Sequence, residues 1–258
     1  MKILITGARS NIGYALSKQL AVRGHIVYAG CKTLKEKEML EEKLRDEKII
    51  MFPIVLDLLN NNIDFRALDI DTLILHASTC NGGSILEISC ERLEEDIDVN
   101  IKGNFRLLQK FLRDCYDNNK KGKIFVTSSL AAFYPLPYLS SYTSSKIYLY
   151  NLVKTLKIEL LYQDLDIKVS LIMPGAYHTG FNDLMINNKE KDPYILKDKA
   201  VGMSKYQKIL FSLLEQENYN ELVRKVVKEI EKEEPSFIIS LPLYQKIFTK
   251  LYVIFRTL

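Results

Sequence analysis

The amino-acid sequence predicts an α/β protein with a doubly wound parallel sheet. Short apolar runs alternate with helical stretches as far as Met173, as in a parallel sheet covered by helices on both faces. A glycine-containing turn joins the first run to the first helical stretch. No repeat and no segment rich in glycine, proline or serine interrupts the sequence, so we expect one domain over residues 1–258.

The first strand and helix illustrate the alternation. Residues 2–6 (KILIT) form a β-rich run that ends at Gly7, and residues 11–23 place Leu16 and Leu20 on one side of a helix. By the same criteria we expect further strands at 26–29, 49–56, 72–77, 123–128, 168–173 and 237–240, and further helices at 35–45, 92–115, 141–161, 205–215, 221–233 and 243–255.

The alternation stops after Pro174. Residues 175–202 are polar and irregular, and we expect 181–216 to form a substrate loop or lid. The last stretch, 242–258, has the spacing of an apolar helix and mixes Leu, Ile, Phe and Tyr with lysines. Such a helix can pack on its own chain, on another subunit or on a membrane surface, and we expect packing rather than membrane contact.

The composition excludes several classes of protein. Of the 258 residues, 47% are hydrophobic and 26% are charged, which is ordinary for a globular domain. Lys and Arg number 36 against 32 Asp and Glu, and this net charge of +4 is too small to indicate a nucleic-acid partner. No apolar run has the length of a signal peptide or of a membrane span, so we expect neither.

The cysteines and histidines do not have the spacing of a metal site. Cys31, Cys80, Cys90 and Cys115 include no C-x-x-C pair, and the three histidines do not cluster near them, so we expect no bound metal. The lack of a disulfide framework agrees with a reducing compartment, and we expect a cytoplasmic protein.

The turn at residues 6–13 (T-G-A-R-S-N-I-G) lies between the first strand and the first helix. At that place backbone N–H groups and the helix dipole can hold a pyrophosphate. Gly7 permits a tight turn, and Gly13 permits close packing of the helix on the sheet. Glycines between strands and helices are common, so the turn alone also fits a purely structural role.

A group of polar side chains is expected near the carboxyl edge of the sheet. Tyr142 and Lys146, in Y-T-S-S-K, share one face of a helix, and a nearby ammonium favours the phenolate form of tyrosine. Ser129 follows the strand 123–128, where its hydroxyl can stabilise charge that develops on a substrate oxygen. Asn100, a poor helix former, lies inside a helical stretch.

From Lys2 to about Thr179, these motifs resemble those of the short-chain dehydrogenases/reductases. The resemblance implies a single Rossmann-like domain with a parallel sheet of about seven strands. The turn is similar to the family's T-G-x-x-x-G-x-G, with Asn11 in place of the middle glycine. Asn is the residue other than glycine that best tolerates left-handed backbone angles, so we expect the turn to be kept. Ser129 also precedes Tyr142 by the family's interval of 13 residues.

A second departure from the family follows the fourth strand. Where the family usually has N-A-G, this sequence has His76-Ala77-Ser78. His76 either replaces the missing hydrogen bonds or marks a loosened site, and we expect a structural replacement.

The resemblance implies a dinucleotide cofactor. After the second strand an acidic residue would bind ribose hydroxyls and repel a 2′-phosphate, but that stretch reads A-G-C-K-T. Lys32 stands where NADP-binding members carry a basic residue and Arg9 adds a cation, so we expect NADP(H) to be preferred over NAD(H). Alternatively, Lys32 only begins a solvated charged helix, and NADH would bind equally well. Asp57 matches the family's aspartate near the adenine ring.

The resemblance also implies which residues form the site. Asn100, Ser129, Tyr142 and Lys146 are the expected catalytic residues. The residues expected at the cofactor are Gly7, Arg9, Ser10, Asn11, Ile12, Gly13, Lys32, Asp57, Leu58, His76, Ala77, Ser78, Tyr142, Lys146, Pro174, Gly175, Tyr177 and Thr179.

The implied reaction is the NADPH-dependent reduction of a ketone or aldehyde to an alcohol. Tyr142 would protonate the carbonyl oxygen, Ser129 would hydrogen-bond it, Lys146 would lower the phenol pKa and hold the ribose, and Asn100 would anchor a proton relay. The segment 130–137 is apolar and aromatic, which favours a hydrophobic substrate. The resemblance further implies a homodimer or homotetramer.

Two alternative functions remain from the sequence. A dinucleotide-binding regulator or scaffold with weak or no catalysis would explain Asn11 and His76, but it leaves the joint presence of the four catalytic residues unexplained. A sugar-nucleotide epimerase or dehydratase would need a longer chain and a glycine where Ser10 stands.

Overall fold

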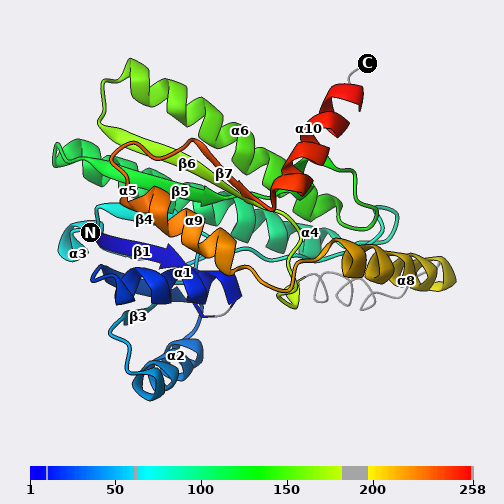
Figure 1. Cartoon of the computed structure of the whole chain (residues 1–258), viewed down its shortest axis with the longest axis horizontal. Coiled ribbons are helices and arrows are strands. Elements are labelled where there is room, and N and C mark those ends of the chain that lie inside the picture. The colour runs from blue at the N-terminus through cyan, green and yellow to red at the C-terminus, as the bar shows by residue number, and fades with distance from the viewer. Residues whose placement is uncertain (10, 61–62, 182–196, 257–258) are drawn as a thin grey trace.

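The computed structural model describes the chain from Met1 to Arg256 except residues 10, 61–62 and 182–196; residues 257–258 also lie outside the described part. Seven parallel strands form one sheet in the order β3-β2-β1-β4-β5-β6-β7 (Figure 1). The strands are β1 (Lys2–Thr6), β2 (Ile26–Cys31), β3 (Phe52–Val55), β4 (Thr72–Leu75), β5 (Gly122–Thr127), β6 (Ile167–Pro174) and β7 (Ile238–Leu241). This sheet confirms the predicted fold class.

Helices follow most strands. They are α1 (Asn11–Val22), α2 (Leu34–Glu47), α3 (Phe65–Leu68), α4 (Cys90–Ile97), α5 (Asn104–Asp117), α6 (Ser140–Tyr162), α8 (Lys197–Leu214), α9 (Asn220–Glu231) and α10 (Leu243–Arg256). A π-helical segment, Asp98–Gly103, joins α4 to α5, and a 3-10 turn, Leu130–Phe133, follows β5.

The observed elements differ from the predicted ones in several places. The single helix predicted at 92–115 is divided into α4, the π-helical segment and α5. Strand β3 pairs only over Phe52–Val55 because it lies at the edge of the sheet, where β2 is its neighbour. Helix α3 was not predicted, since four residues are too few for a periodic pattern. Helix α8 begins at Lys197, so the irregular stretch ends earlier than Gly202. Much of the predicted lid, 182–196, lies outside the described residues.

The sheet is buried on both faces, as the apolar strands predicted. In β1, Ile3 and Ile5 face one core, which includes residues of α1 and α9. Leu4 faces the opposite core, with Phe111 of α5 and Val153 of α6. All five side chains are 0% exposed, and burial of each contributes roughly 1.5–3 kcal/mol. The two layers of helices thus fix the position of the carboxyl edge of the sheet.

Hydrogen bonds tie neighbouring strands together at that edge. The Thr6 hydroxyl accepts the backbone N–H groups of His76 at 2.9 Å and Ala77 at 3.0 Å. The His76 Nδ1 atom lies 3.2 Å from the Thr127 hydroxyl oxygen. The ends of β1, β4 and β5 are therefore linked through His76, which is the geometry that the structural interpretation of this histidine requires.

Two helices project beyond the carboxyl edge. In Figure 1 the strand arrows point toward the side on which α8 and α10 extend away from the sheet. Within the described part of the chain, no helix has both the length and the apolarity needed to cross a lipid bilayer.

The lowered pKa of His76 should make the stability of the folded protein depend on pH. Burial, and to a lesser degree the charge of Lys146, lower the His76 pKa from its ordinary 6.5 to about 4. Between pH 6.5 and 4 the unfolded chain therefore binds a proton that the folded protein does not, and stability falls as pH falls through this window. His76→Asn removes this term, so wild type should lose about 1–3 kcal/mol more than the variant on acidification.

Urea unfolding of both proteins at several pH values from 7 to about 4 measures this difference. Carboxylates titrate in the same range, but they are common to both proteins and cancel in the comparison. Parallel stability curves for wild type and His76→Asn would contradict the prediction.

Candidate active site

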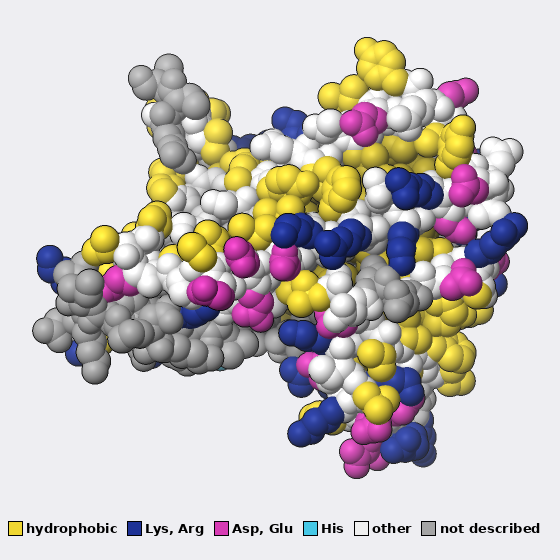
Figure 2. Space-filling model, turned by 180° about the vertical axis from the view of Figure 1, so that it is seen from behind, with side chains coloured by type: hydrophobic (Ala, Val, Ile, Leu, Met, Phe, Trp, Pro, Cys, Tyr) yellow, Lys and Arg dark blue, Asp and Glu magenta, His cyan; other side chains and the backbone are white. Residues whose placement is uncertain are grey.

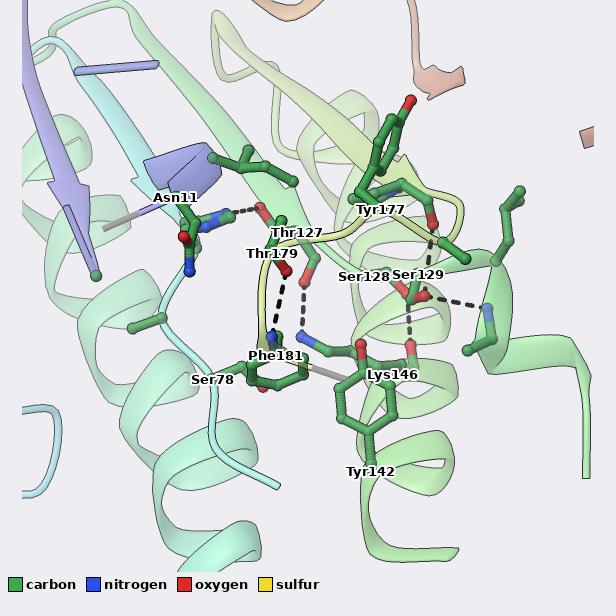
Figure 3. Close-up of a pocket in the computed structure, with 18 of the residues that line it drawn as sticks. Asn11, Ser78, Thr127, Ser128, Ser129, Tyr142, Lys146, Tyr177, Thr179 and Phe181 are labelled. Atoms are coloured by element: carbon green, nitrogen blue, oxygen red, sulfur yellow. Dashed lines mark hydrogen bonds between the residues drawn. The ribbon is translucent and has the colours of Figure 1, made fainter. Parts of the chain in front are cut away.

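A cavity of about 890 Å³ opens at the carboxyl edge of the sheet. Its walls come from the segments that follow β1, β2, β4, β5 and β6, and from the projecting helices α8 and α10. In doubly wound sheets ligands bind at this edge, where the strand order reverses between β1 and β4. Figure 3 shows part of the lining.

The glycine turn forms one end of the cavity. Gly7 has a φ of +68°, and a Cβ there would lie 3.0 Å from the Ala77 Cα atom. Asn11 has a φ of +56°, so it adopts the left-handed angle expected of the residue that replaces a glycine. Gly13 does not line the cavity, but a Cβ at Gly13 would overlap the Gly7 carbonyl oxygen. At Gly7 the backbone thus faces the cavity without a side chain, which fits a pyrophosphate.

An acidic residue that the sequence analysis missed lies near the two expected cations. Glu36, on the first turn of α2, lines the cavity beside Arg9 and Lys32. Its carboxylate is 3.3 Å from the Arg9 Nε atom and accepts the Lys32 backbone N–H at 2.8 Å. The signal in the sequence is T-L-K-E at 33–36, the spacing of a capping box, and Thr33 does cap α2.

Asp57 and Leu58 line the same end of the cavity. The Asp57 side chain accepts the Leu59 N–H at 3.0 Å and so forms part of a turn. Gly30, which was not predicted, also lines this end, and a Cβ there would be 2.9 Å from the Ile5 carbonyl oxygen.

Tyr142 and Lys146 project from α6 toward the end of β5 (Figure 3). The Lys146 ammonium donates to the Thr127 carbonyl oxygen at 3.3 Å and lies 5.4 Å from the centre of the Tyr142 ring. The hydroxyl of Ser128 donates to the Lys146 carbonyl oxygen at 2.8 Å, which ties α6 to β5. Tyr142 is 8% exposed and Lys146 3% exposed, so both polar groups are largely desolvated.

Desolvation shifts both pKa values toward the uncharged forms. Burial lowers the pKa of Lys146 to about 8. Burial also raises the pKa of Tyr142, and this effect exceeds the opposing hydrogen bond from Ser129. Burial dominates this net shift, and the expectation that Lys146 lowers the phenol pKa stays a prediction. The phenol keeps its proton, as a general acid must.

Ser129 lies where β5 gives way to the 3-10 turn. Its hydroxyl accepts the Ala131 N–H at 3.1 Å and lies 3.5 Å from the Pro174 carbonyl oxygen. These contacts hold the hydroxyl at the cavity wall beside the Tyr142 phenol. Serine, tyrosine and lysine are thus brought together as predicted.

Asn100 is not brought into the cavity. It is 0% exposed in the π-helical segment, and its side-chain oxygen accepts the Thr79 N–H at 2.8 Å and the Ser78 hydroxyl at 3.0 Å. Its amide group donates to the Thr79 carbonyl at 2.9 Å and to Ser145 of α6 at 3.3 Å. Asn100 therefore positions the loop after β4 against α6, and its expected role as the anchor of a proton relay stays a prediction.

The remaining predicted cofactor residues can be placed together. Ser10 lies outside the described residues. Those that line the cavity are Gly7, Arg9, Asn11, Ile12, Lys32, Asp57, Leu58, His76, Ala77, Ser78, Tyr142, Lys146, Pro174, Gly175, Tyr177 and Thr179. Within the described part of the chain, no cluster of His, Cys, Asp or Glu could hold a metal ion.

The other end of the cavity is apolar. Of the segment 130–137, the cavity is lined by Leu130, Ala131, Tyr134 and Leu136. Six further side chains complete this end. Phe181, Phe211 and Leu214 belong to the predicted lid, 181–216, whereas Tyr244, Phe248 and Thr249 of α10 were not predicted. No local sequence signal marks the residues of α10, because their contribution depends on where that helix packs.

Gln245 connects the elements that surround the apolar end. Its side-chain oxygen accepts the Ala176 N–H at 2.9 Å, and its amide donates to the Leu214 carbonyl at 2.7 Å. A side chain at Gly175 would overlap the Gln245 oxygen. One residue of α10 thereby holds the segment after β6 and the end of α8 in place.

Known proteins share this architecture. Human 17-beta-hydroxysteroid dehydrogenase type 1 is 31% identical over 208 residues, which are 73% of this chain and 60% of that protein. A short chain dehydrogenase/reductase from Burkholderia phymatum, solved in complex with NAD, has a TM-score of 0.80 at 19% identity over 97% of this chain and 92% of that one. A short-chain dehydrogenase from Sphingobium yanoikuyae, solved in complex with NADPH, has a TM-score of 0.72 at 22% identity over 99% and 93%.

The family comparison covers the glycine turn and the catalytic group but not helices α8 and α10 at the apolar end. Residues 1–190 match the short chain dehydrogenase family, and this range includes the glycine turn, Ser129, Tyr142 and Lys146. The chain therefore belongs to the short chain dehydrogenase family of oxidoreductases.

Proposed function

We propose that this protein uses a nicotinamide dinucleotide, NADPH in preference to NADH, to reduce an apolar ketone or aldehyde to an alcohol. The observation that carries the proposal is one cavity with a glycine cradle at one end and Ser129, Tyr142 and Lys146 beside its apolar end. Ser129, Tyr142 and Lys146 thus line the same cavity as the glycine cradle, which is suited to a pyrophosphate.

The cradle supports the cofactor assignment. Gly7 and Asn11 adopt left-handed angles that keep the backbone open, and Arg9 and Lys32 supply positive charge at the far end. When bound, a nicotinamide dinucleotide supplies the hydride that reduces the carbonyl carbon. Two structural relatives that are described in complex with NAD and with NADPH support the class of cofactor.

The residues beside the apolar end supply the proton that the carbonyl oxygen takes up during reduction. Tyr142 donates its phenol proton to the substrate oxygen, and Ser129 hydrogen-bonds the same oxygen as negative charge develops on it. The Lys146 ammonium stabilises the phenolate that remains, since the two groups are adjacent on α6. Asn100 acts as a positioning residue that fixes α6 and the loop after β4.

The substrate class follows from the lining. Phe181 packs against the Tyr142 ring with 5.7 Å between ring centres, and Leu136, Phe211 and Phe248 line the same end. A carbonyl compound with an apolar body would bury its surface there while its oxygen meets Ser129 and Tyr142. The relative named as a 17-beta-hydroxysteroid dehydrogenase supports a substrate of this kind.

Three further expectations remain part of the proposal. Residues 1–258 would act as one domain, the protein would function in the cytoplasm, and two or four copies would associate. Light scattering measures the molar mass of the protein in solution and so the number of associated copies.

Tyr142→Phe tests the catalytic assignment. The variant lacks the proton donor but keeps the ring, so NADPH-dependent reduction of apolar ketones and aldehydes should fall by about 10²- to 10⁴-fold. The dissociation constant for NADPH, measured by nicotinamide fluorescence, should change by less than about threefold.

Tyr148→Phe is the matched control, because Tyr148 lies on the same helix but does not line the cavity. It should retain full activity. Substantial activity in Tyr142→Phe, or an equal loss in both variants, would show that the phenol is not the acid.

Glu36→Gln tests the cofactor preference. Glutamine keeps an acceptor for the Lys32 N–H but removes the charge that pairs with Arg9 and would repel a 2′-phosphate. NADPH affinity should rise by about three- to tenfold, the size expected for charges that are partly exposed, while NADH affinity stays level or falls.

Glu38→Gln makes the same charge change on α2 outside the cavity and should leave both affinities unchanged. The comparison is made by titration with both dinucleotides. Equal NADPH affinities for wild type and Glu36→Gln would mean that the Glu36 charge does not act on a 2′-phosphate, and the placement of that phosphate beside Arg9 and Glu36 would be wrong.

A further inference from the structure

The outer face of α10 is an exposed apolar stripe. Leu243, Ile247, Leu251 and Phe255 are 58%, 50%, 49% and 71% exposed. They are spaced four residues apart, and with 3.6 residues per helical turn this spacing places them within one arc of the helix surface. A soluble surface rarely carries so many large apolar side chains on one helix face unless something covers them.

The inner face of the same helix is firmly attached. Gln245 bonds to the segment after β6 and to the end of α8, and the Thr249 hydroxyl accepts the Tyr134 hydroxyl at 2.7 Å. The rings of Tyr134 and Tyr252 lie 4.8 Å apart between centres. These contacts hold the helix in one orientation, so the apolar stripe is directed away from the body of the protein.

The charges on α10 are all of one sign. Its sequence, LYQKIFTKLYVIFR, contains no Asp or Glu, and Lys246 and Lys250 flank the stripe. Among the described residues, neither ammonium has an ion-pair partner. Partial burial, and then repulsion from Lys225 and Lys250, lower the pKa of Lys246, which agrees with the excess of positive side chains here.

Helix α8, which also lines the cavity, likewise carries exposed apolar side chains with lysines among them. Tyr206, Ile209 and Leu213 are 59%, 62% and 77% exposed, and Lys205 and Lys208 lie among them. Its Phe211 and Leu214 line the cavity. Figure 2, seen from behind, shows both helices projecting on the same side of the molecule, with hydrophobic side chains on each.

We propose that the outer faces of α10 and α8 dock on the surface of a lipid bilayer that carries anionic headgroups. Exposed apolar and aromatic residues flanked by lysines, without acidic residues on α10, are the pattern of a helix that lies in a membrane interface. The proposal replaces the sequence-based expectation that this helix packs on its own chain or on another subunit.

A second copy of the chain fits this face less well. If two α10 helices packed around a two-fold axis, the lysines of one helix would approach lysines of the other, and the helix offers no carboxylate to compensate them. Anionic headgroups supply the missing negative charge, and the acyl boundary receives the apolar side chains.

Docking would also determine how the substrate enters the cavity. This consequence rests on the proposed function. Residues Phe211 and Phe248 belong to the two docking helices and line the apolar end of the cavity. A carbonyl compound dissolved in the bilayer could then reach Tyr142 without crossing water.

Vesicle flotation of the full chain tests the proposal. Phosphatidylcholine vesicles with about one-third phosphatidylglycerol should bind at least about tenfold more protein than pure phosphatidylcholine vesicles, since each lysine near an anionic surface adds to the affinity. The double variant Ile247→Asp/Leu251→Asp should lose this binding. Lys246→Gln/Lys250→Gln should lose the preference for anionic vesicles.

The matched control is Ile158→Asp/Leu161→Asp, which makes the same changes at residues of α6 that are 56% and 75% exposed. It should bind vesicles as wild type does. The proposal is overturned if wild type binds neither vesicle, if the control loses binding equally, or if light scattering shows that Ile247→Asp/Leu251→Asp only dissociates a dimer.

NADPH titration of each variant separates the two proposals. None of the four substituted positions on α10 lines the cavity, so NADPH affinity should be unchanged. Vesicle binding without NADPH binding would contradict the proposed function and leave the docking surface supported.

Discussion

The amino group of Lys146 lies inside the protein, 3.3 Å from the Thr127 carbonyl oxygen, and the arrangement of the site depends on this burial. A desolvated ammonium loses its proton more readily than a hydrated one, which is why the Lys146 pKa falls to about 8. Its charge also helps to keep the neighbouring His76 neutral, so that the imidazole can link β4 to Thr127 as a hydrogen-bonding group. Lys146 on α6 thus affects the protonation of His76, the residue that links the ends of β4 and β5.

The cavity has two different ends because different residues line them. The glycine turn and the group of Arg9, Lys32 and Glu36 form a polar, partly exposed end, suited to a charged ligand. Tyr142 lies at the other end against Phe181, where water is largely excluded and its phenol holds a proton. A dinucleotide that spans the cavity would bring its reactive ring to the dry end while its phosphates stay at the polar one.

The sequence predicted those features that depend on short stretches of chain. The succession of strands and helices along the chain and the shared helix face of Tyr142 and Lys146 follow from local periodicity. The left-handed angle of Asn11 follows from the backbone preference of asparagine. Glu36 was missed because the expected position for a carboxylate was the end of β2, whereas the actual one comes from the first turn of the next helix. The side chains from α8 and α10, and the upward pKa shift of Tyr142, depend on tertiary packing that periodicity does not encode.

The measurement that tests this account most directly is the pKa of Lys146 itself. Lysine labelled with ¹³C at Cε gives an NMR signal for each side chain, and the signal of Lys146 is assigned by its loss in Lys146→Met. In the protein without cofactor, the account predicts that this signal titrates with a pKa of about 8, well below those of the exposed lysines. A pKa at the ordinary value of about 10.4 would show that the ammonium is hydrated, and the proposed coupling of the site through a buried lysine would be wrong.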